Sequence, residues 1–429
     1  MTGIAWAAVA LFAAVYVLIA TERVHRVAAA LGGAAVVLAF GVVSSEDAFF
    51  SRETGIDWDV IALLLGMMLV VGVVRRTGVF EYLAIKAAKT ARGRPYRVLV
   101  LLLLVTAVAS ALLDNVTTVL LVAPVTLLVC DRLGLPPVPF LIAQALASNI
   151  GGTATLVGDP PNIIIASRSG LTFTDFLVHL APIVVVVMLV FLLMARGMFG
   201  SALRGDPARI ASLMAIDERE AITDPILLRR SAIVLAAIVV GFLLQRQTGV
   251  EPSVVALVGA GVLILVSPLR PHDLVDDVEW ETLLFFMGLF ILVGALVHVG
   301  ALEALAERVA DVTGGNVAAT LVVVLVASAV ISAFVDNIPY VTAMTPVVAS
   351  LVAANPALGE DGALWWALAL GADLGGNATL VGASANVVIV GIAARNGLHI
   401  SFRGWLRFGL PTAAVSVAVC VPYLLLRYA

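Results

Sequence analysis

Long apolar stretches recur along the whole chain, and short polar turns separate them. Examples are Ile4–Ala20, Val27–Val43 and Ser231–Leu244. A membrane-spanning helix needs about 20 mainly apolar residues, and weakly polar flanks bring the shorter runs to that length. Helices satisfy their own backbone groups in lipid, and the strict alternation of membrane strands is not seen. The pattern predicts an all-α polytopic membrane protein embedded in a lipid bilayer.

The composition agrees with this prediction. The 429 residues are 62% hydrophobic and 13% charged, with a mean hydropathy of +1.10. Soluble domains are about one quarter charged. The two cysteines, Cys130 and Cys420, stand apart in apolar surroundings, and the five histidines are scattered. Neither residue type forms a metal or redox motif, so we expect no metal site and no bound cofactor.

Two halves of the chain align with each other. Asp114-Asn115 matches Asp336-Asn337, 222 positions later, and the same offset relates Asp57-Trp58 to Glu279-Trp280. The motif that begins at Asn149 matches the motif that begins at Asp373 after a two-residue shift. Chance matching of small residues would not keep one offset over so many positions. The chain therefore contains an internal repeat.

We expect five crossings in each half, ten in total, and one doubled apolar segment that forms a re-entrant helical hairpin. The first repeat covers 1–199, the polar linker 200–226, which we place in the cytoplasm, and the second repeat 227–429. The hairpins are 95–130 and 316–354, and the glycine-broken helices are 138–168 and 362–394. The remaining crossings are expected at 4–20, 24–43, 57–75, 175–198, 227–245, 251–267, 279–297 and 403–427.

The basic residues predict the orientation. With both termini outside the cell, only Arg52, Arg168, Arg246, Arg308 and Arg427 lie outside, and the other 20 of the 25 Lys and Arg residues lie inside. This distribution follows the positive-inside rule. It indicates a multi-pass protein of the cell membrane. An odd number of crossings per half makes the two repeats inverted, as in many secondary transporters.

Two further stretches have an amphipathic pattern. Val79–Thr90 and Ala301–Val312 each follow a matched glycine and mix apolar and charged residues at helical spacing. We expect both to lie along opposite faces of the membrane.

An Asp-Asn pair lies in the middle of each doubled segment. Inserting an Asp at the centre of a spanning helix costs about 2.5–3.5 kcal/mol, and a hairpin that turns back inside the protein avoids exposing it to lipid. Asp and Asn also cap helices, but a Ser or Asn would cap without an ionisable group. We therefore expect Asp114, Asn115 and Thr117 in one tip, and Asp336 and Asn337 in the other, to bind an ion or a solute.

The glycine-broken helices supply the second part of the predicted site. Paired glycines, followed in the first repeat by Pro160-Pro161, interrupt the helix. Broken helices in matching places of two repeats indicate a binding site at mid-membrane, although Gly and Thr also serve close helix packing. The residues expected here are Asn149, Gly151, Gly152, Thr153, Thr155 and Asn162, with Asp373, Gly375, Gly376, Asn377, Thr379 and Asn386 in the second repeat. Asp159, which precedes Pro160, is a further candidate proton carrier, but we favour its interpretation as a structural turn residue.

These motifs resemble the ion transporter superfamily. The duplicated hairpin and broken helix, with Gly158-Asp159-Pro160-Pro161-Asn162 after Gly151-Gly152-Thr153-Ala154-Thr155, are similar to those of arsenite efflux permeases of the ArsB type. The melanosomal P protein, plant silicon efflux carriers and NhaD-type sodium/proton antiporters are relatives of these permeases. The resemblance implies alternating access, homodimerisation through a scaffold part, and a cytoplasmic ATPase partner if the chain works as ArsB does.

The hairpin tips differ from those of the sodium–dicarboxylate symporters, which carry Ser-Asn-Thr. Two carboxylates here would repel a di-anion by about 4 kcal/mol per close pair at an effective dielectric of 20, and no Arg or Lys lies in the predicted site segments. Transport of di- or tricarboxylates is disfavoured on this basis. Neutral trihydroxides remain suitable because Asn, Thr and Asp bind hydroxyl groups without any thiolate.

Proton-coupled efflux of arsenite or antimonite is therefore the leading functional hypothesis, with Asp114, Asp336 and Asp373 as candidate proton carriers. Sodium/proton antiport is the alternative, and silicic acid efflux ranks below both. A proton or sodium gradient would drive any of these. The Asp-Asn pairs match no nucleophile–base pair and no intramembrane protease motif, so we expect no enzymatic activity. The composition gives no sign of nucleic-acid binding.

Overall fold

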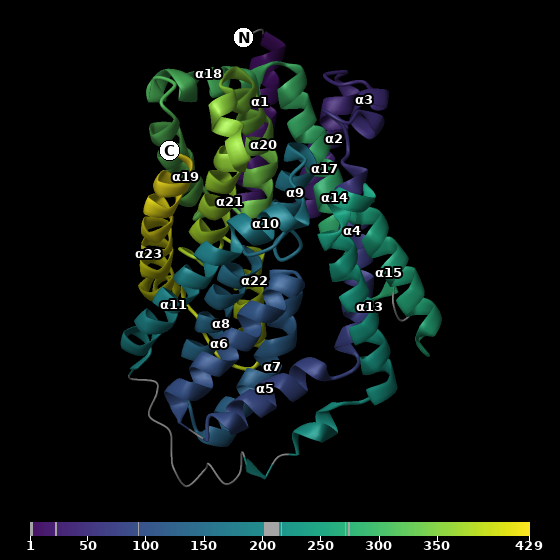
Figure 1. Cartoon of the computed structure of the whole chain (residues 1–429). Helices are drawn as coiled ribbons and strands as arrows, with labels where there is room; N and C mark the ends of the chain where they lie inside the picture. The colour runs from purple at the N-terminus through teal and green to yellow at the C-terminus, as the bar shows by residue number, and fades with distance from the viewer. Residues whose placement is uncertain are drawn as a thin grey trace.

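The computed structural model describes residues 3–21, 24–92, 94–200, 214–215, 217–270, 272 and 275–429. Arg23, whose charge entered the orientation argument, lies outside the described residues, as does most of the predicted linker. The described chain is helical (Figure 1), with 80% helix and no strands among the residues described. The predicted all-α fold is confirmed.

The first repeat has eleven helices in the described residues, and they follow the predicted order. The breaks between them fall at glycines, prolines and capping side chains, as elementary helix chemistry requires. They are α1 (Gly3–Ala20), α2 (Arg26–Ala39), α3 (Ser45–Phe50), α4 (Trp58–Arg75), α5 (Val79–Thr90), α6 (Pro95–Leu112), α7 (Asn115–Leu133), α8 (Pro137–Gly152), α9 (Pro160–Ser169), α10 (Phe173–His179) and α11 (Ala181–Met198).

The second repeat, with the end of the linker, has the same order of long helices. The described elements are η3 (Glu218–Ala221), α13 (Pro225–Leu243), α14 (Gln245–Thr248), α15 (Pro252–Val266), α17 (Trp280–His298), α18 (Ala301–Thr313), α19 (Val317–Ser332), α20 (Asn337–Ala354), η4 (Pro356–Gly362), α21 (Ala363–Gly375), α22 (Ser384–Arg395) and α23 (Phe402–Tyr428).

The short helices α3, α10 and α14 were not predicted. Their runs of four to seven residues are too short to show helical periodicity in a sequence. The predicted crossing 175–198 consists of α10 and α11, which are separated at Leu180. Pro182 falls in the first turn of α11, where its missing N–H and its ring favour the start of a new helix.

Eight helices in the described part of the chain are long and apolar enough to cross a membrane. They include both arms of the first hairpin, α6 and α7, so length alone does not separate a hairpin arm from a crossing. Three predicted crossings, α1, α2 and α15, are apolar but shorter by this measure.

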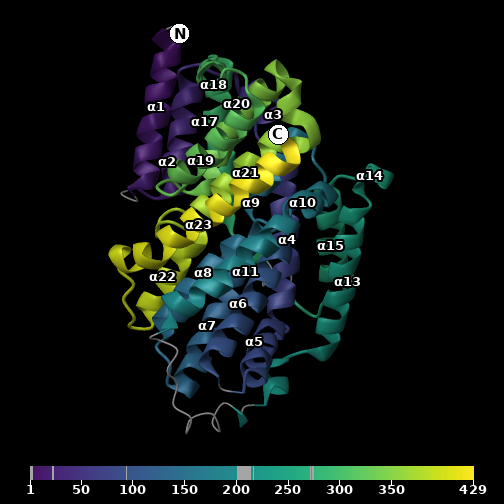
Figure 2. The same ribbon diagram turned by 60° about the vertical axis from the view of Figure 1, so that its left-hand side comes forward.

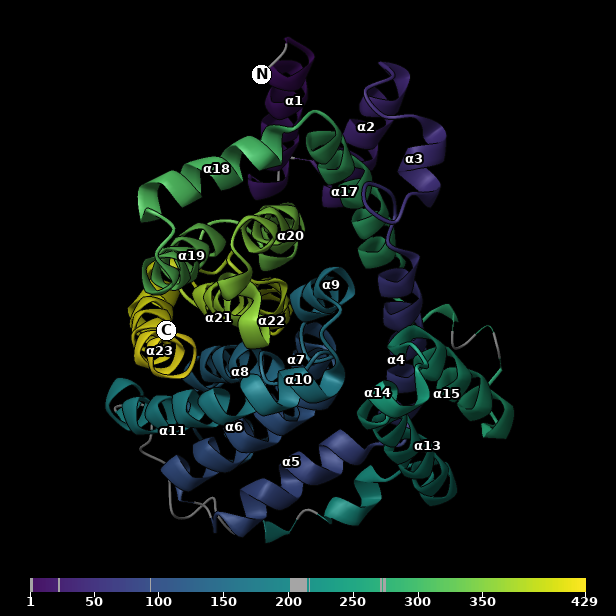
Figure 3. The ribbon, with the colours of Figure 1, turned by 45° about the horizontal axis from the view of Figure 1, so that its top comes forward.

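The helices form two groups, which Figure 3 shows from above. We call the first group the frame, and it consists of α1, α2, α4, α13, α15 and α17. We call the second group the core block. It consists of the hairpins α6–α7 and α19–α20, the broken helices α8–α9 and α21–α22, and the helices α10, α11 and α23. The frame meets the core block where α17 packs on α20, α4 on α9, and α13 on α10.

The two repeats are interlaced in the frame. Helix α2 of the first repeat packs on α17 of the second, and its counterpart α15 of the second repeat packs on α4 of the first. Matched glycines allow both contacts. A Cβ added at Gly66 would lie 2.8 Å from the backbone carbon of Ala256, and one added at Gly288 would lie 2.8 Å from that of Ala30. Small residues that let two backbones approach are the usual basis of helix packing in membranes.

The predicted amphipathic helices are α5 and α18, at opposite ends of the molecule in Figure 2. Gly78 and Gly300, both with a left-handed backbone (φ 74° and 71°), make the sharp turns from α4 and α17 into them. Only glycine adopts this conformation without steric cost. Each amphipathic helix thus connects a frame helix to a hairpin.

The described end of the linker is fastened to the first of these turns. Thr223 donates from its backbone N to Thr77 O (3.1 Å) and from Oγ1 to Arg76 O (2.5 Å). Lys89 of α5 forms an ion pair with Glu218 at 2.5 Å. The hydrogen bond from Lys89 lowers the pKa of the Glu218 carboxyl, because it favours the charged form. The described end of the linker is thus held against α5 and the turn that precedes it, both in the first repeat.

Candidate functional site

The tips of the two hairpins come together in the core block, where Asp159 contacts both. Asp114 caps α7, and its Oδ1 accepts the Thr117 N–H at 2.8 Å. Asp336 caps α20, and its Oδ1 accepts the Ile338 N–H at 3.1 Å. A second bond holds Asp336, because Ser384 at the start of α22 donates to its Oδ2 at 2.6 Å. Both tip carboxylates are therefore held by the starts of helices, as capping chemistry predicts.

Asp159 joins the two tips. Its Oδ2 accepts from Asn115 Nδ2 at 2.8 Å, and both of its carboxylate oxygens lie 3.3 Å from Asn337 Nδ2. The side chain is 1% exposed. Although Asp159 precedes α9, its side chain makes no capping hydrogen bond. A turn position before Pro160 therefore does not account for Asp159, because its carboxylate accepts hydrogen bonds from side-chain amides of both repeats.

A ladder of asparagine side chains continues from this carboxylate into the protein. Asn115 Nδ2 also donates to Asn149 Oδ1 at 3.2 Å. Asn149 Nδ2 in turn donates to Asn377 Oδ1 at 2.9 Å and to Asn386 Oδ1 at 3.0 Å. These residues are buried. The ladder starts in the first repeat and ends in the second. A displacement of either broken helix would therefore strain the hydrogen bonds that reach the hairpin tips.

Polar side chains fasten each broken helix to its own hairpin in the same way. Ser110 Oγ donates to Ser148 O at 2.7 Å, and Ser332 Oγ donates to Ala372 O at 2.6 Å. The interrupting loops are also tied, because Thr155 donates to Ala111 O and Thr379 to Ala333 O. Asn162 and Asn386 close these loops by donating to the carbonyls of Thr155 and Thr379.

The glycines of the broken helices allow the hairpin arms to approach. A Cβ at Gly151 would lie 2.5 Å from the Ala107 Cα, and one at Gly375 would lie 2.5 Å from the Ala329 carbonyl oxygen. Gly152 and Gly376 face the glycines at the far ends of their own loops, with 2.6 Å and 2.7 Å from the added Cβ to the carbonyl oxygen. The predicted glycines therefore position the site without lining it.

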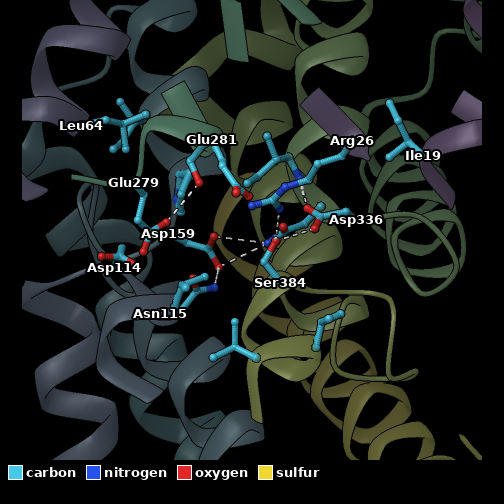
Figure 4. A pocket seen from close by; sticks show the side chains of 18 of the residues that line it. Ile19, Arg26, Leu64, Asp114, Asn115, Asp159, Glu279, Glu281, Asp336 and Ser384 are labelled. Atoms are coloured by element: carbon cyan, nitrogen blue, oxygen red, sulfur yellow. Dashed lines mark hydrogen bonds between the residues drawn. The ribbon is translucent and has the colours of Figure 1, made fainter. Parts of the chain in front are cut away.

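A cavity of about 450 Å³ opens beside the tips, between the core block and the frame. Figure 4 shows Asp114, Asp159 and Glu279 on one side and Asp336 and Ser384 on the other. Carboxylates dominate its polar lining. The ionisable residues along its wall are Asp114, Asp159, Glu279, Glu281 and Asp336, with Arg26 and His25.

Arg26 changes the expectation that no basic residue would lie at the site. It stands at the start of α2, and its Nη1 donates to Ser384 Oγ at 3.4 Å, while its guanidinium lies 5.6 Å from the centre of the Phe285 ring. The predicted site segments contain no Arg or Lys, but the fold brings this one from another part of the chain. The lining still has five carboxylates against one Arg and one His.

The predicted site residues fall into three groups. Four line the cavity, namely Asp114, Asn115, Asp336 and Asn337. Thr117 lies one turn into α7, outside the cavity, and serves through its backbone N–H. The rest lie behind the tips, either in the polar interior (Asn149, Thr153, Asn162, Asp373, Asn377, Asn386) or in the packing and loop contacts already described (Gly151, Gly152, Thr155, Gly375, Gly376, Thr379).

A second cavity of about 470 Å³ lies beyond Ile163, among α3, α9 and the start of α15. Ile163 lines both cavities, flanked by Leu64 and Val157 on the first side and by Leu63 and Leu156 on the second. These side chains are buried and apolar. The hairpin tips are therefore reached from the first cavity, and an apolar wall separates them from the second.

Hydrogen-bond acceptors outnumber free donors in this lining. Among the described residues, no group of three or more His, Cys, Asp or Glu side chains is arranged to hold a metal ion. An acceptor-rich cavity suits a cation, or a neutral solute that donates hydrogen bonds. It suits an anion poorly, because carboxylates and anions repel.

Comparison with known proteins places the chain among transporters. Residues 16–371 match the profile of the citrate transporter family. An uncharacterized transporter of Mycobacterium tuberculosis is 56% identical over 421 residues, with 98% of each chain covered. The P protein of Homo sapiens is 34% identical over 500 residues, which cover 98% of this chain and 60% of that one.

A solved structure has a similar fold. The YdaH transporter of Alcanivorax borkumensis, described as having an unusual topology, superposes with a TM-score of 0.62 at 14% identity, covering 93% of this chain and 96% of that one. Together with the residues matched above, these likenesses agree with the resemblance drawn from the hairpin and loop motifs. The chain is a membrane transporter and belongs to the citrate transporter family of the ion transporter superfamily.

Proposed function

We propose that this protein is a secondary transporter that couples the movement of protons to the efflux of a small solute bound at the hairpin tips. The observation that carries the proposal is the position of Asp159. Its carboxylate accepts amide hydrogens from the tips of both inverted repeats and also lines the cavity. A group that contacts the solute space and both repeats at once suits alternating access, because a change in its charge acts on both hairpins.

The proposed cargo is a neutral trihydroxide of the arsenite or antimonite type. Such a solute offers three O–H donors, and the lining offers the carboxylates of Asp114, Asp159 and Asp336 as acceptors. Binding through hydroxyl groups needs no thiolate. Cys130 and Cys420 are buried and do not line the cavity.

Cation/proton antiport is the second candidate, and the excess of carboxylates over basic groups favours it. Carboxylates that exchange a proton for a cation would serve this reaction directly. The family profile is described as a citrate transporter, which makes citrate a third solute to test. Arg26 is the residue in the lining that could bind a carboxylate group of such an anion.

Substitution of Arg26 separates these cargo classes. We expect Arg26→Gln to leave the affinity for a neutral trihydroxide within about threefold of the wild-type value, since neutral solutes feel little of the removed charge. A transported cation would bind more tightly to the variant, because a repelling charge is lost, and a carboxylate anion would bind more weakly. Competition against a radiolabelled solute in proteoliposomes measures the three affinities. A loss of arsenite affinity of 10-fold or more (about 1.4 kcal/mol) would argue against a neutral cargo.

A flux screen tests the proposed function. Proteoliposomes with an imposed proton gradient are offered arsenite, antimonite, silicic acid, sodium and citrate in turn. We expect arsenite and antimonite to accumulate with the gradient and proton movement to accompany them. Sodium-driven proton movement with no response to arsenite would replace the leading proposal by the second candidate. Empty liposomes and liposomes that hold the Asp159→Asn variant are the controls.

The orientation and partners are also proposed. The distribution of basic residues supports placing both termini outside the cell membrane and the linker in the cytoplasm. Homodimerisation and an ATPase partner stay predictions that rest on the resemblance to arsenite permeases.

A further inference from the structure

Asp373 is buried among polar groups that do not satisfy it. It lies near the end of α21, is 0% exposed, and does not line the solute cavity. Neither of its carboxylate oxygens has a hydrogen-bond partner. The side chains of Thr153 and Asn162, from the broken helix of the other repeat, lie beside it. A buried charge without partners costs several kcal/mol. The ionised form of this carboxyl group would therefore be unfavourable here.

The side chain of Asn162, which lies beside Asp373, shows which hydrogen bond is missing. Asn162 uses both of its Nδ2 hydrogens in the loop, where it donates to the carbonyls of Thr153 (3.5 Å) and Thr155 (3.0 Å). Its Oδ1 is buried and has no donor. Asp373 and the neighbouring side chain of Asn162 thus both have unpartnered acceptor oxygens, and a single hydrogen shared between these oxygens would satisfy both.

The mirror position in the other repeat contains that hydrogen. Asn149 is the counterpart of Asp373, and Asn386 is the counterpart of Asn162, each 224 positions apart in the sequence. Asn149 Nδ2 donates to Asn386 Oδ1 at 3.0 Å. Asp373 has a carboxyl group where Asn149 has an amide of nearly the same shape, so the N–H donor is missing at Asp373. A protonated Asp373 restores it, with an O–H in the place of the N–H.

The ionisable groups around Asp373 favour the same state. Helices α8 and α19, which pack on α21, carry no ionisable side chain. The other packed elements are α9, which begins after Asp159 and carries Arg168 near its far end, α20 with Asp336 and Tyr340, η4 with Glu360 and Asp361, and α23 with Arg403, Arg407, Cys420, Tyr423, Arg427 and Tyr428. Asp159 is close enough for its charge to act on Asp373. Of two neighbouring buried carboxyls, the one without donors stays neutral more readily, and Asp159 has two amide donors.

We propose that Asp373 holds a proton, which it donates to Asn162 Oδ1, in a closed site that is separate from the solute cavity. This inference rests on the proposed function and names the proton site of that transporter. The solute would bind at Asp114, Asp159 and Asp336, whereas the proton would sit behind them where the two broken helices cross. Asp114 and Asp336 are then capping and solute-binding groups rather than proton carriers.

The separation explains how a proton could control access. Loss of the proton from Asp373 leaves a buried charge opposite Asn162 Oδ1, which is an acceptor. The closed arrangement then becomes unfavourable, and the α21–α9 contact must open to admit water or a donor. The asparagine ladder begins at Asn377, four residues after Asp373, and runs through Asn149 to Asn115 and so to Asp159. A change at Asp373 therefore reaches the solute cavity.

Infrared spectroscopy of the purified protein tests the protonation directly and needs no solute. In a detergent free of ester groups, the wild-type protein should show the carbonyl stretch of a buried carboxylic acid, and Asp373→Asn should lose it. Asp131→Asn, at an exposed position near the end of α7, is the matched control and should keep it. Absence of the band from the wild-type protein at neutral pH overturns the proposal, as does a carboxylate band that shifts on addition of sodium, which would mean a bound cation.

Transport supplies the second test. In proteoliposomes, the rate of solute exchange by Asp373→Asn should no longer vary with pH, whereas the wild-type rate should. If this variant does not insert, the exchanged pair Asn149→Asp with Asp373→Asn moves the carboxyl to the mirror position and should restore both the infrared band and the pH dependence. Unchanged pH dependence in Asp373→Asn overturns the proposal. If the wild-type protein moves no solute with protons, the proposed function fails, while the infrared result on Asp373 stands separately.

Discussion

Replacing Asp159 by Asn is expected to reduce transport by at least about 100-fold. The wild-type carboxylate accepts amide hydrogens from Asn115 and Asn337, one from each hairpin tip. An Asn at this position has one oxygen and one NH2 group, so its NH2 would face one of the two donors. Hydrogen bonds to charged groups contribute about 1.5–3 kcal/mol each, and leaving a buried amide unpaired adds to the loss. The tips would then no longer be joined.

Initial rates of solute uptake into proteoliposomes measure this effect. Asp131→Asn, which makes the same chemical change at an exposed residue, should transport at the wild-type rate. Comparison of thermal denaturation midpoints shows whether Asp159→Asn still folds. If Asp159→Asn folds and transports within threefold of the wild-type rate, then its bridging carboxylate is not part of the transport site.

Replacing Gly375 by Ala is expected to destabilise the protein strongly. The new Cβ would lie 2.5 Å from the Ala329 carbonyl oxygen, and the obstacle is backbone that cannot rotate away. Overpacking of this kind costs about 1–3 kcal/mol, occasionally more. Either α19 or α21 would have to shift, and both Asp373 and Asn377 lie within two residues of the substituted glycine. We therefore expect a lower denaturation midpoint together with loss of transport.

Gly391 is the matched control for this substitution. It lies in α22, the second part of the same broken helix, and a Cβ there meets nothing within 4 Å. Gly391→Ala should keep transport and raise the denaturation midpoint slightly, since Ala is better than Gly inside a helix by about 0.5–1 kcal/mol. Equal destabilisation by both substitutions would show that close approach of the hairpin arm is not what requires glycine at position 375.

The order of the helices could largely be predicted from the sequence. Each element occurs twice, so the pattern of one copy could be checked against the other. The amphipathic helix α5 runs over Val79–Thr90, as expected, and α18 ends one residue beyond its predicted end at Val312. The hairpins were predicted from Asp-Asn pairs that lipid would not tolerate. The sequence does not show how the repeats interlace, with α2 on α17 and α15 on α4. Such contacts depend on how the surfaces of two helices fit together, which the hydrophobic periodicity of each helix does not reveal.

The sequence interpretation ranked Asp159 too low and missed Arg26, in both cases for physical reasons. Asp159 has Ala383 as its counterpart, so a search for matched polar positions passes over it. The available signal was an acidic residue beside the break of a buried helix, where an unpaired charge would be costly. Arg26 reaches Ser384 from 358 positions away, and its place at the end of an ordinary crossing gives no hint of this contact.

The differences between the repeats carry more functional information than their likeness. Matched groups, such as Ser110 with Ser332 and Thr155 with Thr379, fasten each broken helix to its hairpin in the same way. The acidic residue Asp373 has the neutral counterpart Asn149. A symmetric scaffold thus carries an asymmetric distribution of charge, which a transporter needs if a proton is to be held on one side of the pseudo-twofold axis.

Proton movement driven by the solute shows whether this transporter couples the two fluxes. Proteoliposomes that contain a pH-sensitive dye are given an outward or inward gradient of arsenite with no initial pH difference. We expect a pH change inside the vesicles whose sign reverses with the direction of the solute gradient, and which is absent in the Asp159→Asn variant. Solute flux at the wild-type rate with no accompanying pH change, for arsenite and for each of the other solutes of the screen, would contradict it.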